Sequence, residues 1–184
     1  MEFSIRPATV GDADAIARVH GQSWDESYRG LLPDEIIDRQ MAPTGFLASW
    51  RARLENFDPT EPTVGHVFVA TVAAEQAPET GGLIGFVAAG TSRDEGNGCL
   101  GEIRALYLLQ AFQRHGIGKA LWNAGVEDLA SRGLLPGHVV TLVENPTVKF
   151  YERMGAVEFV RTTCRHSWAQ HLEEVSLRFD RPCP

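Results

Sequence analysis

The residues best suited to chemistry in this chain form one short run, Gln113-Arg114-His115-Gly116-Ile117-Gly118. The run lies between an apolar segment typical of a strand, 103–109, and a segment with helical spacing, 119–132. Gly116 and Gly118 have no Cβ, so the main chain can adopt unusual dihedrals and approach a ligand closely. The first N–H groups of a helix lack partners within the helix, and such donors favour phosphate. The order strand, glycine turn, helix therefore predicts a phosphate-binding turn.

Two common phosphate-binding signatures do not fit this turn. A Walker loop needs Ser or Thr after Gly118-Lys119, where Ala120 stands, and it begins with a glycine where this chain has Gln113. The dinucleotide fingerprint needs a small residue at its last position, where Leu121 stands, and no βαβ unit opens the chain. The remaining pattern is Gln/Arg-x-x-Gly-x-Gly/Ala.

Apolar periodicity predicts the elements that hold this turn. We expect strands at 3–6, 64–73, 83–91, 100–109, 138–143, 156–168 and 172–179, and helices from 11–12 to 21–24, from 33, at 46–57, at 119–132 and at 146–154. This alternation predicts an α/β fold with one mixed sheet and helices on its faces, in which 100–143 forms a parallel unit with a right-handed crossover. Without a repeat or a long linker, residues 1–184 are expected to form a single domain.

Composition narrows the functional classes. The chain is 43% hydrophobic and 22% charged, as in soluble globular proteins. It has neither an apolar run of membrane-spanning length nor an export signal, which predicts a cytoplasmic protein with no membrane contact. A formal net charge of −7 argues against nucleic-acid binding and favours a cationic or neutral partner. Cys99, Cys164 and Cys183 are too far apart for a disulfide framework or a paired zinc motif, so no metal is expected.

Two motifs on successive strand-helix units carry a family resemblance. The first runs from Leu106-Tyr107-Leu108 through Gln113-x-x-Gly116-x-Gly118-Lys119-Ala120-Leu121, and the second from Asn145-Pro146 through Phe150-Tyr151-Glu152-Arg153-Met154-Gly155-Ala156. In this order and separation they resemble the GNAT superfamily of acyl-CoA-dependent N-acyltransferases, and the likeness spans nearly the full chain. It implies a mostly antiparallel sheet with helices on both faces. The parallel strands 100–109 and 138–143 would splay at the cofactor site.

The resemblance also implies that acetyl-CoA is the co-substrate, and it indicates where each part of that molecule would bind. Its pyrophosphate would lie on the N–H groups of about 114–119, with Arg114 and Lys119 balancing the charge. Backbone groups at 106–108, at a bulge where this strand diverges from the next, would pair with the pantetheine arm and polarise the thioester. Asn145 would cap the following helix and meet the same arm. The cofactor-binding residues implied are Leu106, Tyr107, Leu108, Gln113, Arg114, His115, Gly116, Ile117, Gly118, Lys119, Asn145 and Tyr151.

Acetyl transfer to an amine needs a neutral nucleophile, a polarised carbonyl and a protonated leaving thiolate. By the resemblance, Glu102 is the candidate general base, acting directly or through water; otherwise it is an exposed glutamate on a strand face. Tyr151 is the candidate acid, because a phenol with a pKa near 10 holds its proton at neutral pH; otherwise it is a core tyrosine. Trp24 and Tyr28, expected to follow the first helix, are candidate walls of the substrate pocket or packing residues.

These expectations predict an enzyme that transfers an acetyl group from acetyl-CoA to a primary amine by direct attack in a ternary complex. The acceptor stays open between a small molecule and a protein N-terminus or lysine, and the acidic balance favours a small cationic molecule. A non-catalytic acyl-CoA-binding module is the alternative, against which Glu102 and Tyr151 argue. The terminal strands within 156–179 could pair across a homodimer, as exposed edges do.

Overall fold

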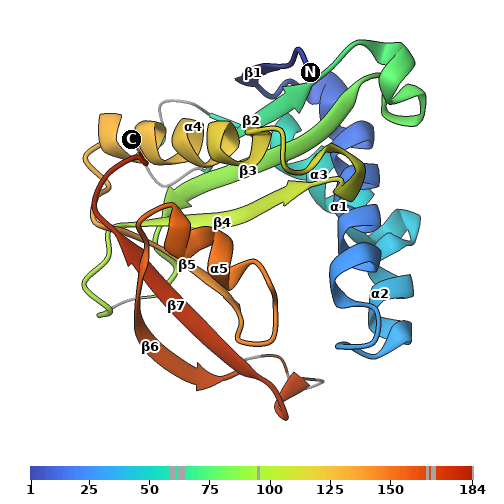
Figure 1. The fold of residues 1–184 in the computed structure, drawn as a ribbon. Coiled ribbons are helices and arrows are strands. Elements are labelled where there is room, and N and C mark those ends of the chain that lie inside the picture. Colours follow the sequence, from blue (N-terminus) through green and yellow to red (C-terminus); the bar gives the residue numbers. More distant parts are fainter. Residues whose placement is uncertain (59–60, 62–64, 95, 165, 167–168, 184) are drawn as a thin grey trace.

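The fold is built around one seven-stranded sheet (Figure 1). A computed structural model describes residues 1–184 except 59–60, 62–64, 95, 165, 167–168 and 184. The strands are β1 (Ser4–Pro7), β2 (His66–Thr71), β3 (Leu83–Thr91), β4 (Gly101–Leu108), β5 (Gly137–Leu142), β6 (Val157–Thr163) and β7 (Glu173–Phe179), in the order β1-β2-β3-β4-β5-β7-β6. Within this described sheet, β4 and β5 are parallel and the other neighbours are antiparallel. The predicted mixed sheet is therefore confirmed.

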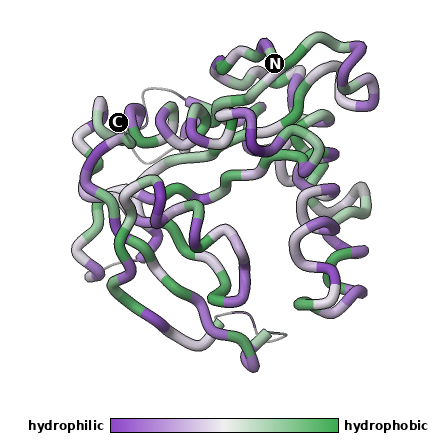
Figure 2. The backbone as a smooth tube through the Cα atoms, in the orientation of Figure 1, coloured by the Kyte–Doolittle hydropathy of each residue, from purple (hydrophilic) through white to green (hydrophobic). Residues whose placement is uncertain are grey.

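Helices cover both faces of the sheet, as predicted. They are α1 (Ala13–Tyr28), α2 (Asp34–Met41), α3 (Ala48–Glu55), α4 (Ile117–Ser131) and α5 (Val148–Arg153). Apolar residues of α4 and α5 form one core layer with the sheet, and those of α1 and α3 form the other. Strand β3 is buried along almost its whole length between these layers, which explains its uninterrupted apolar sequence and the agreement with the predicted range 83–91. Figure 2 shows hydrophobic segments along the central strands.

The sheet divides between β4 and β5. Their pairing covers only residues 101–103 with 137–139, although the strands continue to Leu108 and Leu142. A bulge in β4 lies just beyond the paired part: Ile103 pairs with Ala89 and Ala105 with Ala88, so Arg104 is the extra residue. The prediction that put the bulge at 106–108 is wrong in position. Those residues follow the bulge, on the diverging part of the strand.

Several helix boundaries differ from the sequence prediction, and the differences in α1 and α4 affect the site. Helix α1 continues to Tyr28 rather than ending at 21–24. A Cβ on Gly21 would lie 3.3 Å from Met41 Cγ, so this glycine permits the close approach of α2 instead of stopping α1. Helix α4 begins at Ile117, two residues earlier than predicted, with Gly116 as its N-cap. Among the described residues, no helix combines the length and apolar character needed to cross a membrane.

Candidate active site

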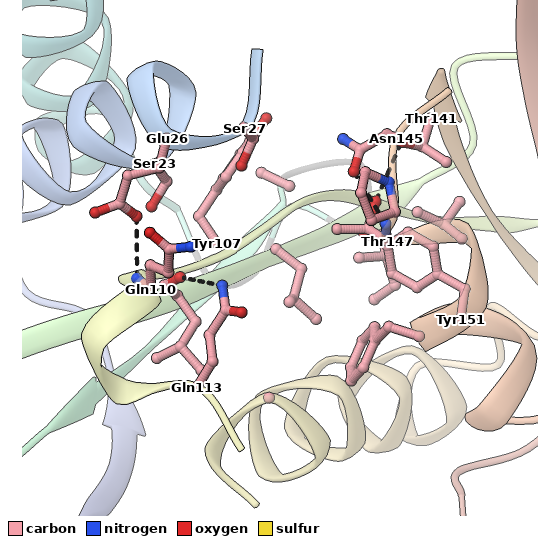
Figure 3. Close-up of a pocket in the computed structure, with 18 of the residues that line it drawn as sticks. Ser23, Glu26, Ser27, Tyr107, Gln110, Gln113, Thr141, Asn145, Thr147 and Tyr151 are labelled. Carbon is pink, nitrogen blue, oxygen red and sulfur yellow. Dashed lines mark hydrogen bonds between the residues drawn. The ribbon is translucent and has the colours of Figure 1, made fainter. Parts of the chain in front are cut away.

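A cavity of about 670 Å³ opens where β4 and β5 part (Figure 3). In Figure 3, Ser23, Glu26 and Gln110 lie on one side of it, and Thr141, Asn145 and Tyr151 lie on the other. Most of the predicted site residues line the cavity: Tyr28, Leu106, Tyr107, Leu108, Gln113, Arg114, Gly116, Gly118, Lys119, Asn145 and Tyr151. The described lining does not include Trp24, Glu102, His115 or Ile117. The fold thus gathers residues from α1, β4, the glycine turn, α4, β5 and α5.

The glycine turn bends the chain sharply before α4. Arg114 and Gly116 have φ of 67° and 82°, both in the left-handed region, where only glycine is free of a Cβ penalty. The first α4 N–H bonded to a helix carbonyl is that of Ala120, to the Gly116 oxygen at 3.1 Å. The N–H groups of Ile117 and Gly118 precede it, at the positions where a helix start leaves donors without intrahelical partners. Ile117 is fully buried and His115 is exposed, so neither side chain joins the wall.

Gly118, in the first turn of α4, has no side chain to fill the space beside Phe150 at the edge of the cavity. A Cβ at this position would lie 3.3 Å from Phe150 Cε2 and 3.6 Å from Phe150 Cζ. The absence of a side chain therefore lets α5 approach the beginning of α4 and leaves the backbone bare toward the cavity. This close approach is the structural reason for the second glycine of the motif.

The charged side chains of the lining are mostly basic. Arg104, Arg114, Lys119 and Arg153 contribute to it, and Glu26 is the acidic residue among the described lining residues. Glu26 Oε2 accepts a hydrogen bond from the Gln110 N–H at 3.0 Å, and Oε1 accepts one from Gln22 Nε2 at 2.9 Å. The sequence prediction missed Glu26, Ser23 and Ser27 because it ended α1 too early. Their spacing of three or four residues on one helix face would have grouped them.

Every tyrosine of the chain lines the cavity. The sequence contains three, Tyr28, Tyr107 and Tyr151, and they come from α1, β4 and α5. Burial raises the pKa of each phenol. Tyr151 is only 6% exposed, and its ring lies 5.5 Å from that of Trp122 between centroids. All three hydroxyls therefore hold their protons at neutral pH and can donate hydrogen bonds.

Trp24 lies behind this wall. Its indole Nε1 donates to the Tyr107 hydroxyl at 2.9 Å. Next to it, the His20 ring stacks on Phe46 with centroids 3.6 Å apart, and His20 Nδ1 accepts a hydrogen bond from Trp50 Nε1 at 3.1 Å. Burial lowers the pKa of His20 to about 3, so the imidazole is neutral. Trp24 thus supports a wall residue from within an aromatic cluster.

Glu102 is buried beside Arg93 and is not the exposed strand residue of the alternative interpretation. It is 3% exposed and accepts hydrogen bonds from the Arg93 backbone N–H at 3.1 Å and from Arg93 Nε at 2.9 Å. Burial acts to raise the pKa of this carboxyl, but the hydrogen bonds and charge of Arg93 outweigh it and the pKa is lowered. Its role as general base stays a prediction.

Asn145 prepares the turn that leads into α5. Its side chain is 4% exposed, and Oδ1 accepts a hydrogen bond from the Thr147 N–H at 3.0 Å. The predicted role of Asn145 as the helix N-cap is wrong in position, because α5 begins at Val148 with Thr147 as its N-cap, and Asn145 instead closes a local turn on Thr147. Because Oδ1 is engaged in this turn, the amide NH₂ is the group left to meet other partners in the lining.

Comparison with known proteins decides the family. Residues 63–155, about half of the chain, match the acetyltransferase (GNAT) domain. The chain belongs to the GNAT acetyltransferase family. This GNAT chain is 32% identical over 149 residues to YuaI of Bacillus subtilis (strain 168), described as an uncharacterized N-acetyltransferase, covering 81% of this chain and 77% of that protein. The predicted family and the predicted enzyme class, an N-acetyltransferase, are confirmed.

Solved structures share the GNAT fold of this chain. The PaiA N-acetyltransferase of Thermoplasma acidophilum, solved with coenzyme A, superposes with a TM-score of 0.66 at 17% identity, covering 97% of this chain and 100% of that one. NAA60 of Arabidopsis thaliana, solved with a bisubstrate analogue, gives 0.69 at 18% identity and covers 100% of both chains. At these identities the likeness establishes the fold.

Proposed function

We propose that this GNAT enzyme transfers an acetyl group from acetyl-CoA to the primary amine of a small cationic molecule, by direct attack in a ternary complex. The observation that carries the proposal is the cavity at the β4–β5 split, which the glycine turn bounds on one side and α1 with Glu26 bounds on another. Both reactants need to meet at such a place, because the thioester must face the amine within bonding reach.

The residues of the cavity fit the co-substrate. The N–H groups at 117–119, with Arg114 and Lys119 in the same wall, suit a diphosphate. Residues 106–108 of β4 lie beyond the last pairing with β5, so that edge of the strand is open toward the cavity. Such an edge suits the amide groups of the pantetheine arm. Gln113 and Asn145 add polar side chains along this path, and the donor Gln113 Nε2 already reaches the Leu108 oxygen at 3.3 Å.

Proton handling follows from two predicted residues. Tyr151 lines the cavity and holds its proton, so it is the proposed donor to the thiolate as the C–S bond breaks. Glu102 is covered by Arg93 and lies outside the described lining, so direct contact with the amine is not favoured. In this proposal Glu102 accepts the proton of the acceptor ammonium through water.

The acceptor side favours a small cation. Glu26 presents a carboxylate that two hydrogen bonds hold in place. Close to Tyr28, the apolar residues Leu32 and Ile37 of the α1–α2 region form one buried cluster with Leu142, Cys164, Ala169 and Leu172. This cluster packs the α1–α2 region against β5 and the chain around residues 164–172, and the proposal takes it as a barrier to a polypeptide acceptor. A small amine is therefore preferred over a protein acceptor.

A thiol-release assay tests the proposal. The enzyme is incubated with acetyl-CoA and a panel of diamines, polyamines, amino sugars, peptides with free N-termini and lysine peptides. We expect turnover of small cationic amines. Glu26→Gln should raise KM for the amine about fivefold, equivalent to about 1 kcal/mol for an exposed ion pair, with KM for acetyl-CoA unchanged. Asp25→Asn is the matched control, because Asp25 pairs with Arg29 and is not in the described lining.

Three outcomes would count against the proposal. Preferential turnover of peptides would transfer the assignment to a protein acceptor. Thermal stabilisation by CoA without turnover of any amine would indicate a binding module, since a ligand selective for the native state raises apparent stability. If CoA neither stabilised the protein nor supported turnover, acetyl-CoA would not be its co-substrate.

A further inference from the structure

Two arginine side chains, Arg53 of α3 and Arg104 of β4, meet over a pair of glycines. A Cβ on Gly65 would lie 2.3 Å from Arg53 Nη2 and 3.1 Å from Arg104 Nη1, so both guanidiniums lie against this glycine. A Cβ on Gly90 would lie 2.9 Å from Arg104 Cζ and 2.9 Å from Gly65 Cα. The two glycines therefore leave the room that the two guanidiniums occupy.

The charged residues around this pair of arginines are already matched with one another. Arg93 forms an ion pair with Glu102. Arg132 forms one with Asp128, which also contacts His66. Within the described part of the chain, neither of the two central guanidiniums forms an ion pair with a carboxylate. Two positive charges of this group therefore have no matched negative charge there.

The two central guanidiniums also retain hydrogen-bond donors. Arg104 Nη2 donates to the Thr91 carbonyl oxygen at 2.7 Å and to Thr91 Oγ1 at 3.2 Å, and Arg53 Cζ lies 5.3 Å from the centroid of the Trp50 ring. In the described structure, Arg53 Nη2 and Arg104 Nε are enclosed and have no acceptor. Burial and then the charge of Arg104 lower the pKa of Arg53 to about 10, and burial lowers the pKa of Arg104 more than Glu102 raises it. Enclosed donors of like charge destabilise the fold unless an acceptor of opposite charge joins them.

We propose that Arg53 and Arg104 form a binding site for a small divalent oxyanion that carries a phosphate group. Such a group supplies two negative charges and several acceptor oxygens, which the two guanidiniums lack, and the planar fork of donors on arginine suits it. Both residues are partly exposed, and the neighbouring Arg93 side chain is 63% exposed, so the group borders solvent.

This anion site is distinct from the cavity at the β4–β5 split. Arg53, Gly65 and Gly90 are outside the described lining of that cavity, and Arg104 is the member of the group that also belongs to it. Arg104 is the bulge residue of β4, so an ion bound there would hold the strand at the point where it leaves β5. The inference goes beyond the proposed function and does not depend on it.

Thermal unfolding in phosphate tests the site. At pH 7 and constant ionic strength, chloride is replaced stepwise by inorganic phosphate, and Tm should rise by about 5 °C at a hundredfold excess over Kd. Arg53→Met should lose most of this rise. Arg51→Met is the matched control, because Arg51 lies in the same helix but is exposed and pairs with Asp14, so this variant should respond like the wild type. No rise in the wild type, or the same rise in Arg53→Met, would overturn the inference.

A second measurement locates the ion, because the glycine turn before α4 also suits phosphate. Crystals of the wild type are soaked in selenate, and we expect an anomalous selenium peak within hydrogen-bond reach of both Arg53 and Arg104. A peak at the glycine turn alone would overturn the site. A peak at the arginines without a rise of Tm in solution would mean an adventitious ion only and would overturn it as well.

The source of the phosphate group is distinguished by repeating the unfolding series with glycerol 2-phosphate. A rise of Tm with inorganic phosphate alone would identify a free ion as the ligand, and a rise with both compounds would identify a phosphate monoester. Either result supports the site, provided that Arg53→Met loses the rise and Arg51→Met keeps it.

Discussion

At the scale of single residues, Glu102 shows how one side chain can be both buried and charged. The carboxylate is taken out of water at the point where the sheet begins to divide, and Arg93, which is itself 63% exposed, supplies the compensating charge. A buried carboxylate without such a partner would be protonated or would destabilise the fold. The pair therefore keeps the carboxylate ionised next to the β4–β5 split.

Arg93→Met should destabilise the protein, because the Glu102 carboxylate would remain buried without its donors. We expect the free energy of unfolding at pH 7 to fall by about 1–3 kcal/mol in urea titrations. The folded-state pKa of Glu102 is lowered, so the stability that the pair contributes is present above the unfolded pKa and is lost as pH falls through the folded pKa. The difference between variant and wild type should shrink over that range. Equal stability at pH 7 would show that the pair contributes nothing.

The base prediction for Glu102 needs a separate test. Glu102→Gln should lower kcat/KM and remove the limb of the pH profile that reports its ionisation, because a glutamine cannot accept the ammonium proton. The double variant Arg93→Met/Glu102→Gln controls for the lost ion pair, since it has no buried charge. An unchanged pH profile in Glu102→Gln would assign the residue a structural role alone.

His20 predicts an acid-sensitive fold. Its pKa is near 6.5 when unfolded and is lowered to about 3 in the folded state, so between these values only the unfolded state binds the proton. Stability should therefore fall as pH drops from about 6.5 toward 3, with a contribution from this residue of up to about 1.4 kcal/mol per pH unit. Urea unfolding of His20→Gln across this range should give a shallower slope. His171→Gln, at an exposed position, is the control and should follow the wild type.

At the scale of elements, the β4–turn–α4 unit positions most of the site. Gly118→Val should block the cofactor site, because a branched side chain would enter the space between α4 and the Phe150 ring. We expect the variant to fold but to lose the thermal stabilisation that CoA gives to the wild type. Ala130→Val, in the same helix at an exposed position, controls for the lower helix propensity of valine. Full stabilisation of Gly118→Val by CoA would contradict the proposed cofactor position.

The sequence pattern predicted an element well where burial alone determines its structure. The uninterrupted apolar run of β3 has one solution, a strand covered on both faces, and its bounds were predicted at 83–91. The end of α1 was missed because Gly21 weakens a helix locally, whereas its contact with Met41 depends on tertiary packing. The bulge at Arg104 and the Arg93–Glu102 pair also come from neighbours that a linear pattern does not contain. Glu26 was not predicted as a site residue, because the predicted first helix ended before it.

At the scale of the whole molecule, β6 ends the sheet and is exposed along most of its length. Val157 and Val160 are 68% and 39% exposed there. An apolar edge strand of this kind is a template for pairing, which is why a homodimer through β6 stays our prediction. The Glu158–Arg161 ion pair on the same strand limits the apolar surface available.

Sedimentation over a range of concentrations tests the dimer. We expect wild-type protein to associate and Val157→Lys/Val160→Lys to shift toward monomer, because lysines on an edge strand oppose pairing. Val10→Lys, at a position that is 52% exposed and far from β6 in the sequence, is the control and should associate like the wild type. A wild-type protein that is monomeric at every concentration would contradict the predicted homodimer.

The parting of β4 and β5 has a consequence for the protein without its co-substrate. Beyond residues 103 and 139, each of these strands keeps a backbone partner on its outer side, in β3 and β7, while the inner edges face each other without a shared ladder. An extended molecule with amide groups at strand-like intervals would supply the missing rungs. Acetyl-CoA would then complete the sheet as well as react, and backbone hydrogen exchange along both inner edges should slow when it is present.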